Sequence, residues 1–227
     1  MNAIILAAGM GTRLRPITLH TPKSLVKVNN KPLIETQIEY LREIGVQNIT
    51  VVVGYLAEQF DYLVEKYNVK IIFNEFYNTY NNIYTMTLVM DNLQNSYVID
   101  ADVFMTKNFL LKNSTTSLYF SGKKDTVGEW ALDVDANNRV YNIHDSNGEE
   151  YIMSGVSYWT TQDAKVLAHK LQEKIKTHPE SWEQLYWDDI VKENLSEITV
   201  KRHQIACDDW YEIDSLEDYN AVLAQYR

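Results

Sequence analysis

Residues 2–16 read NAIILAAGMGTRLRP, an apolar run that leads directly into glycines, a threonine and two arginines. The run from Ala3 to Leu6 is typical of a buried strand, and a glycine-rich turn after such a strand presents backbone N–H groups to phosphate. Two common phosphate loops do not fit. A dinucleotide fingerprint that starts at Gly9 requires glycine where this chain has Leu14, and the Gly-Lys-Ser/Thr of a Walker A loop does not follow. The stretch therefore predicts a phosphate-binding loop of another class.

The composition indicates a protein that acts on small polar molecules. The chain has 227 residues and a formal net charge of -10, and its basic residues are scattered outside the stretch from Arg13 to Lys27. A nucleic-acid surface needs a basic stripe, so we expect no nucleic-acid partner. The N-terminus lacks a basic leader and its apolar run is too short to span a membrane, which predicts a cytoplasmic protein without membrane contact. The single Cys207 excludes an internal disulfide and is expected to be a core thiol.

The first half of the chain alternates predicted strands and helices. Strands are predicted at residues 3–6, 48–55, 69–73 and 96–104, and helices at residues 32–44, 56–66 and 82–93. The strands are apolar on both faces, which is typical of a parallel sheet covered by helices. We therefore expect an α/β fold with a Rossmann-like mixed, mainly parallel sheet flanked by helices.

The second half changes to strands joined by turns. Strands are predicted at residues 115–121, 129–135, 139–143 and 151–159, with turns at DANN (135–138) and DSNG (145–148). This pattern predicts an antiparallel extension of the sheet. Further predicted elements are helices at 161–176 and 179–193, strands at 197–203 and 210–214, and a last helix opened by the capping box Ser215-x-x-Asp218.

A thirty-residue stretch carries a family resemblance. Residues 6–35, LAAGMGTRLRPITLHTPKSLVKVNNKPLIE, resemble the N-terminal signature of the nucleotidyltransferases that make NDP-sugars and CDP-alcohols. The matched positions include Gly9, Gly11, Thr12, Arg13, Pro22, Lys23, Lys31, Pro32 and Leu33. The resemblance implies one nucleotidyltransferase domain over residues 1–227, with a nucleotide-binding half at roughly 1–110 and an acceptor-binding half with the C-terminal helix at 111–227.

The resemblance also implies the roles of the loop residues. It assigns catalysis to Arg13 and Lys23, whose guanidinium and ammonium groups can hold nucleotide phosphates and stabilise charge at the α-phosphorus. The family reads the base with backbone groups of the strand end and the glycine loop. Asparagine can donate to and accept from cytosine, although an Asn-Asn pair is also an ordinary helix start. The predicted nucleotide-binding residues are Leu6, Ala8, Gly9, Gly11, Thr12, Arg13, Lys23, Tyr80, Asn81 and Asn82.

Two carboxylates are predicted to bind the Mg2+ that accompanies a nucleoside triphosphate. Ligands lie at the carboxyl ends of parallel strands, which favours Asp102 of VIDADVF, with Asp100 as a second candidate. The segment DDWYEIDSLEDYN is similar to the C-terminal ending of the family, which assigns Asp214 to the same metal. Glu217 and Asp218 follow a helix start, where carboxylates pair with free amide groups, so they are expected to be structural.

The acceptor is predicted from one departure and one further similarity. Sugar nucleotidyltransferases carry a Glu-Lys-Pro segment whose lysine meets the sugar phosphate, but residues 140–158 of this chain contain no lysine. Residues 74–88, NEFYNTYNNIYTMTL, resemble the branch that transfers CMP from CTP to phosphocholine or to aminoalkylphosphonates. We therefore expect CTP and phosphocholine as substrates. An aminoalkylphosphonate, a sugar 1-phosphate, and a non-catalytic nucleotide sensor with the same fold stay open as alternatives.

Aromatic side chains next to acids are the predicted acceptor-binding residues. A quaternary ammonium group donates no N–H hydrogen bond, so proteins hold it with aromatic faces and a carboxylate. The same aromatics at helical or strand spacing also suit an ordinary core, and Trp182, Tyr186 and Asp189 share helical spacing. The candidates are Trp130, Tyr186, Trp187 and Trp210, with Glu212 or Asp189 as the countercharge.

Overall fold

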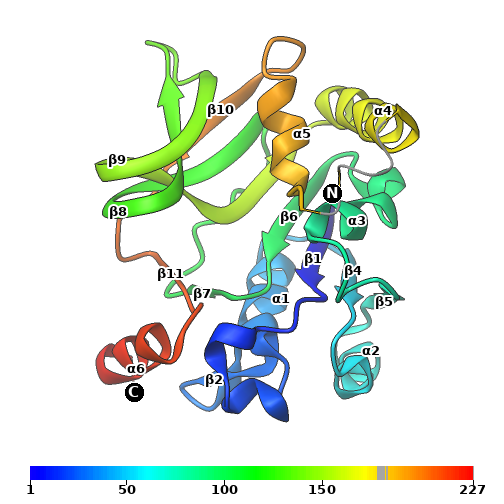
Figure 1. Ribbon diagram of the computed structural model, residues 1–227, viewed down its shortest axis with the longest axis vertical. Coiled ribbons are helices and arrows are strands. Elements are labelled where there is room, and N and C mark those ends of the chain that lie inside the picture. Colours follow the sequence, from blue (N-terminus) through cyan, green and yellow to red (C-terminus); the bar gives the residue numbers. More distant parts are fainter. Residues whose placement is uncertain (178–181, 183, 227) are drawn as a thin grey trace.

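A seven-stranded sheet forms the centre of the protein (Figure 1). The computed structural model describes residues 1–177, 182 and 184–226. The strand order is β10-β8-β9-β6-β1-β4-β5, and among these described strands only β9 runs antiparallel to its neighbours. The strands are β1 (Asn2–Ala7), β4 (Asn48–Val53), β5 (Lys70–Phe73), β6 (Ser96–Asp100), β8 (Ser117–Val134), β9 (Val140–Trp159) and β10 (Val200–Gln204). The predicted mixed, mainly parallel sheet is confirmed.

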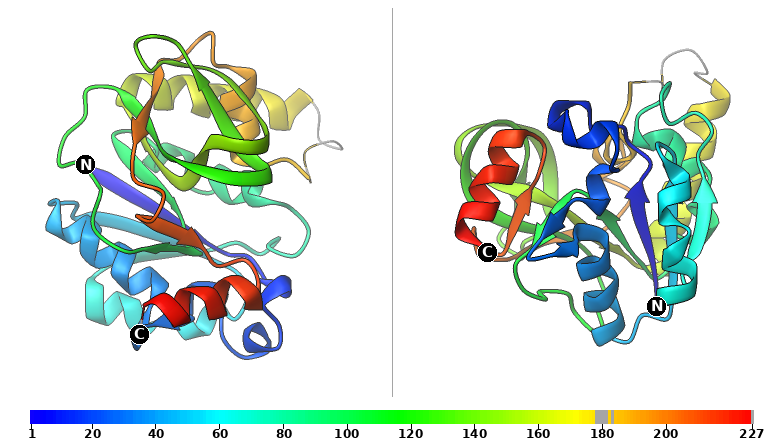
Figure 2. Two further views of the ribbon diagram at one scale, coloured as in Figure 1. Left: turned by 90° about the vertical axis from the view of Figure 1, so that its left-hand side faces the viewer. Right: turned by 90° about the horizontal axis from the view of Figure 1, so that it is seen from below.

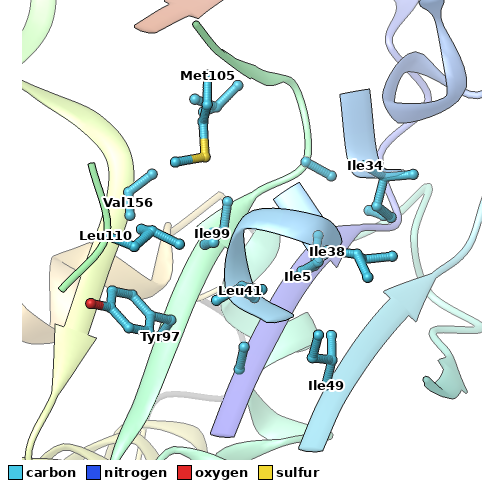
Figure 3. Packing of buried hydrophobic residues seen from close by; sticks show 14 of the residues in the cluster. Ile5, Ile34, Ile38, Leu41, Ile49, Tyr97, Ile99, Met105, Leu110 and Val156 are labelled. Atoms are coloured by element: carbon cyan, nitrogen blue, oxygen red, sulfur yellow. The ribbon is translucent and has the colours of Figure 1, made fainter. Parts of the chain in front are cut away.

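Helices cover both faces of the sheet because its strands alternate buried side chains between two cores. Ile5 of β1 belongs to one core and Ile4 to the other. On the first face, Ile34 and Ile38 of α1 lie over Ile5 (Figure 3), and α2 covers the same side. On the second face, α3, α4 and α5 pack together. The helices are α1 (Leu33–Glu43), α2 (Tyr62–Tyr67), α3 (Asn82–Thr87), α4 (Thr161–Thr177), α5 (Trp187–Glu193) and α6 (Leu216–Gln225).

Strands β8 and β9 form one long ribbon that curls back on itself (Figure 2). Ile152 of β9 pairs with both Gly122 and Ala131 of β8, which closes the curl. The four strands predicted between residues 115 and 159 are therefore two, and only DANN is a turn. DSNG lies inside β9, where Asp145 pairs with Trp130, so the prediction of a turn at 145–148 is wrong. Cross-strand pairing outweighs the local turn preference of these residues.

Short antiparallel pairs attach the C-terminal segment to the sheet. Strand β11 (Trp210–Glu212) pairs with β7 (Val103–Met105), which follows β6, and β2 (Lys27–Val28) pairs with β3 (Lys31–Pro32). The predicted capping box of α6 is confirmed, because Ser215 and Asp218 exchange hydrogen bonds. The pairing of β11 with β7 brings the acidic C-terminal stretch to the end of β6, whereas β2 and β3 pair within the N-terminal segment.

Other predictions needed correction. The helix predicted at 56–66 is a 3-10 turn (Ala57–Phe60) followed by α2, and that at 82–93 is α3 followed by a 3-10 turn (Met90–Asn92). Helix α5 starts at Trp187, and residues 179–181 and 183 of the helix predicted at 179–193 lie outside the described residues. Cys207 is exposed, because it lies in the connection between β10 and β11 and not in the core. Within the described residues, no helix has the length and apolar character needed to cross a membrane.

The close contact between β8 and β11 gives a test of this packing. A Cβ atom at Gly122 would lie 2.4 Å from the ring of Trp210. We expect Gly122→Ala to lower the free energy of unfolding by about 1–3 kcal/mol, because a packed core resists added volume. Urea denaturation measures this. Gly9→Ala is the control, since no atom lies within 4 Å of its added Cβ; equal losses in both variants would contradict the close packing.

Candidate active site

A cavity of about 500 Å³ opens at the carboxyl ends of β1 and β6. The two strands are parallel neighbours, with Leu6 opposite Asp100. After β1 the chain continues to β4 and β5 on one side of this pair, and after β6 it continues to the strands on the other side. Open α/β sheets bind ligands at such a switch point, because the loops that follow the strands separate there. The glycine loop after β1, the turn after β6, the segment before α3 and the segment before α5 surround the cavity.

The ten predicted nucleotide-binding residues all line this cavity: Leu6, Ala8, Gly9, Gly11, Thr12, Arg13, Lys23, Tyr80, Asn81 and Asn82. Gly11 has a φ of 58°, and a Cβ there would lie 3.0 Å from the Cβ of Lys23. Both facts favour glycine at this position. The glycine loop therefore packs tightly against the start of the Lys23 side chain.

The predicted catalytic and metal-binding residues form one ionic cluster. Lys23 Nζ lies 2.7 Å from Asp102 Oδ2 and also hydrogen-bonds Asp214 Oδ1, and Arg13 lies 3.0 Å from the same Asp214 oxygen. Burial alone would lower the pKa of Lys23, but the two carboxylates outweigh it and raise the pKa above its ordinary value. The cluster thus joins the glycine loop, the end of β6 and the C-terminal segment.

The carboxylates of Asp102 and Asp214 are suited to a divalent cation. Their oxygens already converge on a single cationic group, the ammonium of Lys23. Mg2+ commonly binds one or two carboxylates and completes its coordination with phosphate oxygens and water. No cluster of three or more His, Cys, Asp or Glu side chains that could hold a metal alone occurs in the described part of the chain. The residues therefore fit a metal that binds together with the triphosphate.

Further carboxylates extend the cluster away from the glycine loop. Burial raises the pKa of Asp100 well above its usual range, and the nearby charges of Asp102, Asp188 and Glu212 add to the rise. Burial likewise raises the pKa of Glu212 to about 8, with Asp102 as the next cause. Lys124 opposes this shift only in part. Asp100 and Glu212 thus form an acidic wall next to the metal-binding candidates, and they keep their protons to a higher pH than ordinary carboxyl groups do.

The structure separates the predicted aromatic residues into two groups. Tyr186 lines the cavity, and Trp130 packs edge-on against it with ring centroids 6.0 Å apart. None of the three tryptophans lines the cavity: Trp130 adjoins it only through its contact with Tyr186, and Trp187 and Trp210 are only 4% and 1% exposed. The ring of Trp187 packs against Trp159, and the ring of Trp210 lies beneath the ammonium of Lys124 at 3.7 Å. Their hydrophobic surface is used inside the fold.

The two predicted countercharges also differ. Asp189 Oδ2 accepts a hydrogen bond from the backbone N–H of Tyr186 at 2.8 Å, so its carboxylate caps helix α5. Glu212 is half-buried in the acidic wall and close enough to Asp102 and Asp214 to feel their charge. Of the two, Glu212 is the one near the metal-binding candidates, but neither Glu212 nor Asp189 is among the residues that line the cavity.

Several cavity residues were not predicted from the sequence. They are Ala7, Met10, Ser24, Asn74, Tyr77, Asn78, Thr79, Thr85, Ala101 and Gln184. Asn74 could have been found, because it directly follows the predicted strand at 69–73 and so lies at the same sheet edge as the glycine loop. Gln184 has no such signal, since it reaches the cavity only through the fold of the segment before α5.

The fold and cavity define a nucleotidyltransferase, and comparison with known proteins agrees. The chain belongs to the nucleotidyl transferase family, which it matches over residues 2–115. It is 46% identical over 223 residues to the choline-phosphate cytidylyltransferase of Streptococcus pneumoniae, covering 98% of this chain and 96% of that protein. It is 36% identical over 225 residues to the 2-aminoethylphosphonate cytidylyltransferase of Lancefieldella rimae, with coverages of 97% and 91%.

Structural comparison gives the same result. A solved structure of the CTP:phosphocholine cytidylyltransferase from Streptococcus pneumoniae matches with a TM-score of 0.95 at 46% identity, and covers 99% of this chain and 98% of that one. The family resemblance of residues 6–35 is therefore confirmed.

Asp188, a buried residue behind the acidic wall, gives a test of these electrostatics. Its Oδ1 accepts a hydrogen bond of 2.6 Å from the hydroxyl of Tyr119, and burial raises its pKa to about 7. The folded protein keeps this proton up to about pH 7, whereas the unfolded chain releases it near about pH 4. Asp188 therefore makes the free energy of unfolding fall as pH rises between these values.

We expect Asp188→Asn to weaken this decline and to leave the protein more stable than the wild type at pH 8, because asparagine keeps the acceptor oxygen without the charge. Urea denaturation from pH 4 to 8 measures the effect. The exposed Asp91→Asn serves as the control for loss of a negative charge. A decline of unchanged slope in Asp188→Asn would contradict the assignment.

Proposed function

We propose that this protein transfers CMP from CTP to phosphocholine and releases pyrophosphate. The observation that carries the proposal is the convergence of Lys23, Arg13, Asp102 and Asp214 in one cavity beside the glycine loop. The similarity to choline-phosphate cytidylyltransferase over nearly the whole chain supports the choice of both substrates.

The glycine loop and its cations would bind the triphosphate of CTP. The backbone from Gly9 to Thr12 lines the cavity and can donate N–H groups, and Arg13 is largely exposed and free to approach phosphate oxygens. Asp102 and Asp214 would hold Mg2+, which when bound neutralises part of the charge on the phosphates. Lys23 lies next to the same carboxylates and would stabilise the charge that develops at the α-phosphorus.

The acidic and aromatic side of the cavity would bind the choline group. A trimethylammonium group offers no N–H donor, and therefore binds to aromatic faces and carboxylates. Trp130 and Tyr186 pack together at this side. The ammonium group of Lys192 already lies 5.7 Å from the ring centroid of Trp130. The carboxyl groups of Glu212 and Asp100 lie near one another here, and a bound cation would favour their ionised forms and so lower their raised pKa values. These features support a cationic acceptor better than a neutral sugar.

The reaction needs no general base on the protein. A phosphate monoester has a second pKa of roughly 6, so the phosphate of phosphocholine is mostly a dianion near neutral pH. One of its oxygens would attack the α-phosphorus of CTP in line and form the new P–O bond, while the bond to pyrophosphate breaks on the opposite side. The protein would act by holding the two anions together and by balancing their charge.

The proposed activity is tested by pyrophosphate release with Mg2+. Purified protein is assayed with CTP, UTP, dTTP or ATP, each combined with phosphocholine, 2-aminoethylphosphonate or glucose 1-phosphate. We expect the highest kcat/KM for CTP with phosphocholine. Preference for 2-aminoethylphosphonate would keep the cytidylyltransferase chemistry and change the acceptor, preference for glucose 1-phosphate would refute the cationic pocket, and no turnover would favour a nucleotide sensor.

The predicted metal ligands are tested separately. We expect Asp102→Asn and Asp214→Asn each to lower kcat/KM at least about 100-fold, because each removes a charged ligand from the metal that balances the triphosphate. The exposed Asp208→Asn is the control for a lost charge near the C-terminal segment. Circular dichroism verifies that the variants fold. Near-normal turnover in a folded variant would remove that aspartate from the metal site.

A further inference from the structure

The start of α3 is bound to the segment that leads into α5. Asn81 Nδ2 donates to the carbonyl of Gln184 at 2.7 Å, and Asn82 Oδ1 accepts from the backbone N–H of Trp187 at 2.8 Å. The ring of Tyr80 stacks on that of Trp182, with centroids 4.8 Å apart. Three consecutive residues that were predicted to contact the nucleotide thus also hold a segment about one hundred residues away.

The hydrogen bond from Trp187 to Asn82 is a capping interaction supplied by another element. The N–H groups in the first turn of a helix have no partner within that helix. At α5, Asp189 accepts from the N–H of Tyr186, and Asn82 accepts from the next N–H along the chain, that of Trp187. The position of the first turn of α5 therefore depends on Asn82.

The segment that leads into α5 borders the side of the cavity where we propose that the acceptor binds. Tyr186, directly before the helix, lines the cavity and contacts Trp130. Asp188, in the first turn, is buried and bound to Tyr119, and its charge reaches Asp100. A shift at this end of α5 would move Tyr186 and its contact with Trp130, the two residues proposed to bind the acceptor. Asn82 itself also lines the cavity and is one of the residues predicted for the nucleotide.

We propose that Asn82 is a positioning residue that fixes the acceptor side of the site through α5, and that its side-chain oxygen is used for this purpose rather than for reading the base. This inference rests on the proposed function, because it assumes that an acceptor binds beside Tyr186 and Trp130. The inference therefore predicts that Asn82 affects acceptor binding, whereas its sequence context predicted contact with the nucleotide.

The test is steady-state kinetics of the full-length protein with CTP and phosphocholine each varied. We expect Asn82→Ala to raise the KM for phosphocholine about tenfold and to change the KM for CTP and the preference for CTP over UTP less than about twofold. Asn82→Asp keeps an acceptor oxygen at the same place, so at saturating CTP we expect the KM for phosphocholine to return to within about threefold of the wild type.

Asn194→Ala is the matched control. Asn194 follows the other end of α5, where its Nδ2 donates to the carbonyl of Ile190 at 2.7 Å, and it does not line the cavity. This variant loses a similar hydrogen bond of the same helix, and we expect its phosphocholine KM to stay near that of the wild type. Thermal denaturation of each variant verifies that the protein is folded at the assay temperature.

The remaining outcomes separate the inference from the proposed function. If Asn82→Ala mainly raises the KM for CTP or changes the CTP over UTP preference, Asn82 reads the base and the inference is overturned. If Asn82→Ala behaves like the wild type, or Asn194→Ala shows the same defect, positioning through this hydrogen bond is also overturned. If the folded wild type fails to turn over any acceptor with CTP, the proposed function fails first, and this inference fails with it.

Discussion

The contact between Lys23 and the carboxylates of Asp102 and Asp214 is the interaction on which the site depends. Asp102 lies 79 positions from Lys23 in the chain and Asp214 lies 191 positions from it, so no local structure could bring the three residues together. Two carboxylates held this close, with Asp100 and Glu212 nearby, would repel one another in a partly buried site. Lys23 and Arg13 balance that charge and make the arrangement compatible with a folded protein.

The sheet explains why this cluster forms where it does. Parallel pairing of β1 with β6 places the glycine loop and Asp102 at the same edge. Antiparallel pairing of β11 with β7 then brings Asp214 to that edge from the other end of the chain. The backbone N–H of Ile213 donates to the carbonyl of Asp102 at 3.2 Å, which fixes the two strands of chain beside each other. The cluster is thus held by main-chain pairing and does not rely on flexible side chains alone.

The acceptor side is built differently. It combines the curled β8–β9 ribbon, which carries Trp130, with the first turn of α5, which follows Tyr186. Neither segment contacts the glycine loop through a shared strand pair. Hydrogen bonds from the start of α3 connect α5 to the nucleotide side instead. Such a connection fixes the distance between the segments proposed to bind the two substrates.

Much of the fold and many of the residues that line the cavity could be predicted from the sequence because their signals are local. The apolar strands, the glycines and the cations between Gly9 and Lys23 stand close together in the chain, and the parallel sheet follows from strands that are apolar on both faces. The capping box at Ser215 is equally local. By contrast, the turn predicted at 145–148 was lost because cross-strand pairing with β8 decides the backbone there.

The sequence by itself determined the class of sheet and the family to which the chain belongs, since both are written in the spacing of neighbouring residues. Only the tertiary structure decided which aromatics lie at the cavity or next to it. Trp130 and Trp210 have similar acidic neighbours in the sequence, yet Trp210 is buried beneath Lys124 and Trp130 packs on the cavity residue Tyr186. The physical reason is that the surroundings of a large aromatic ring are set by residues distant in the chain, which a local pattern does not contain.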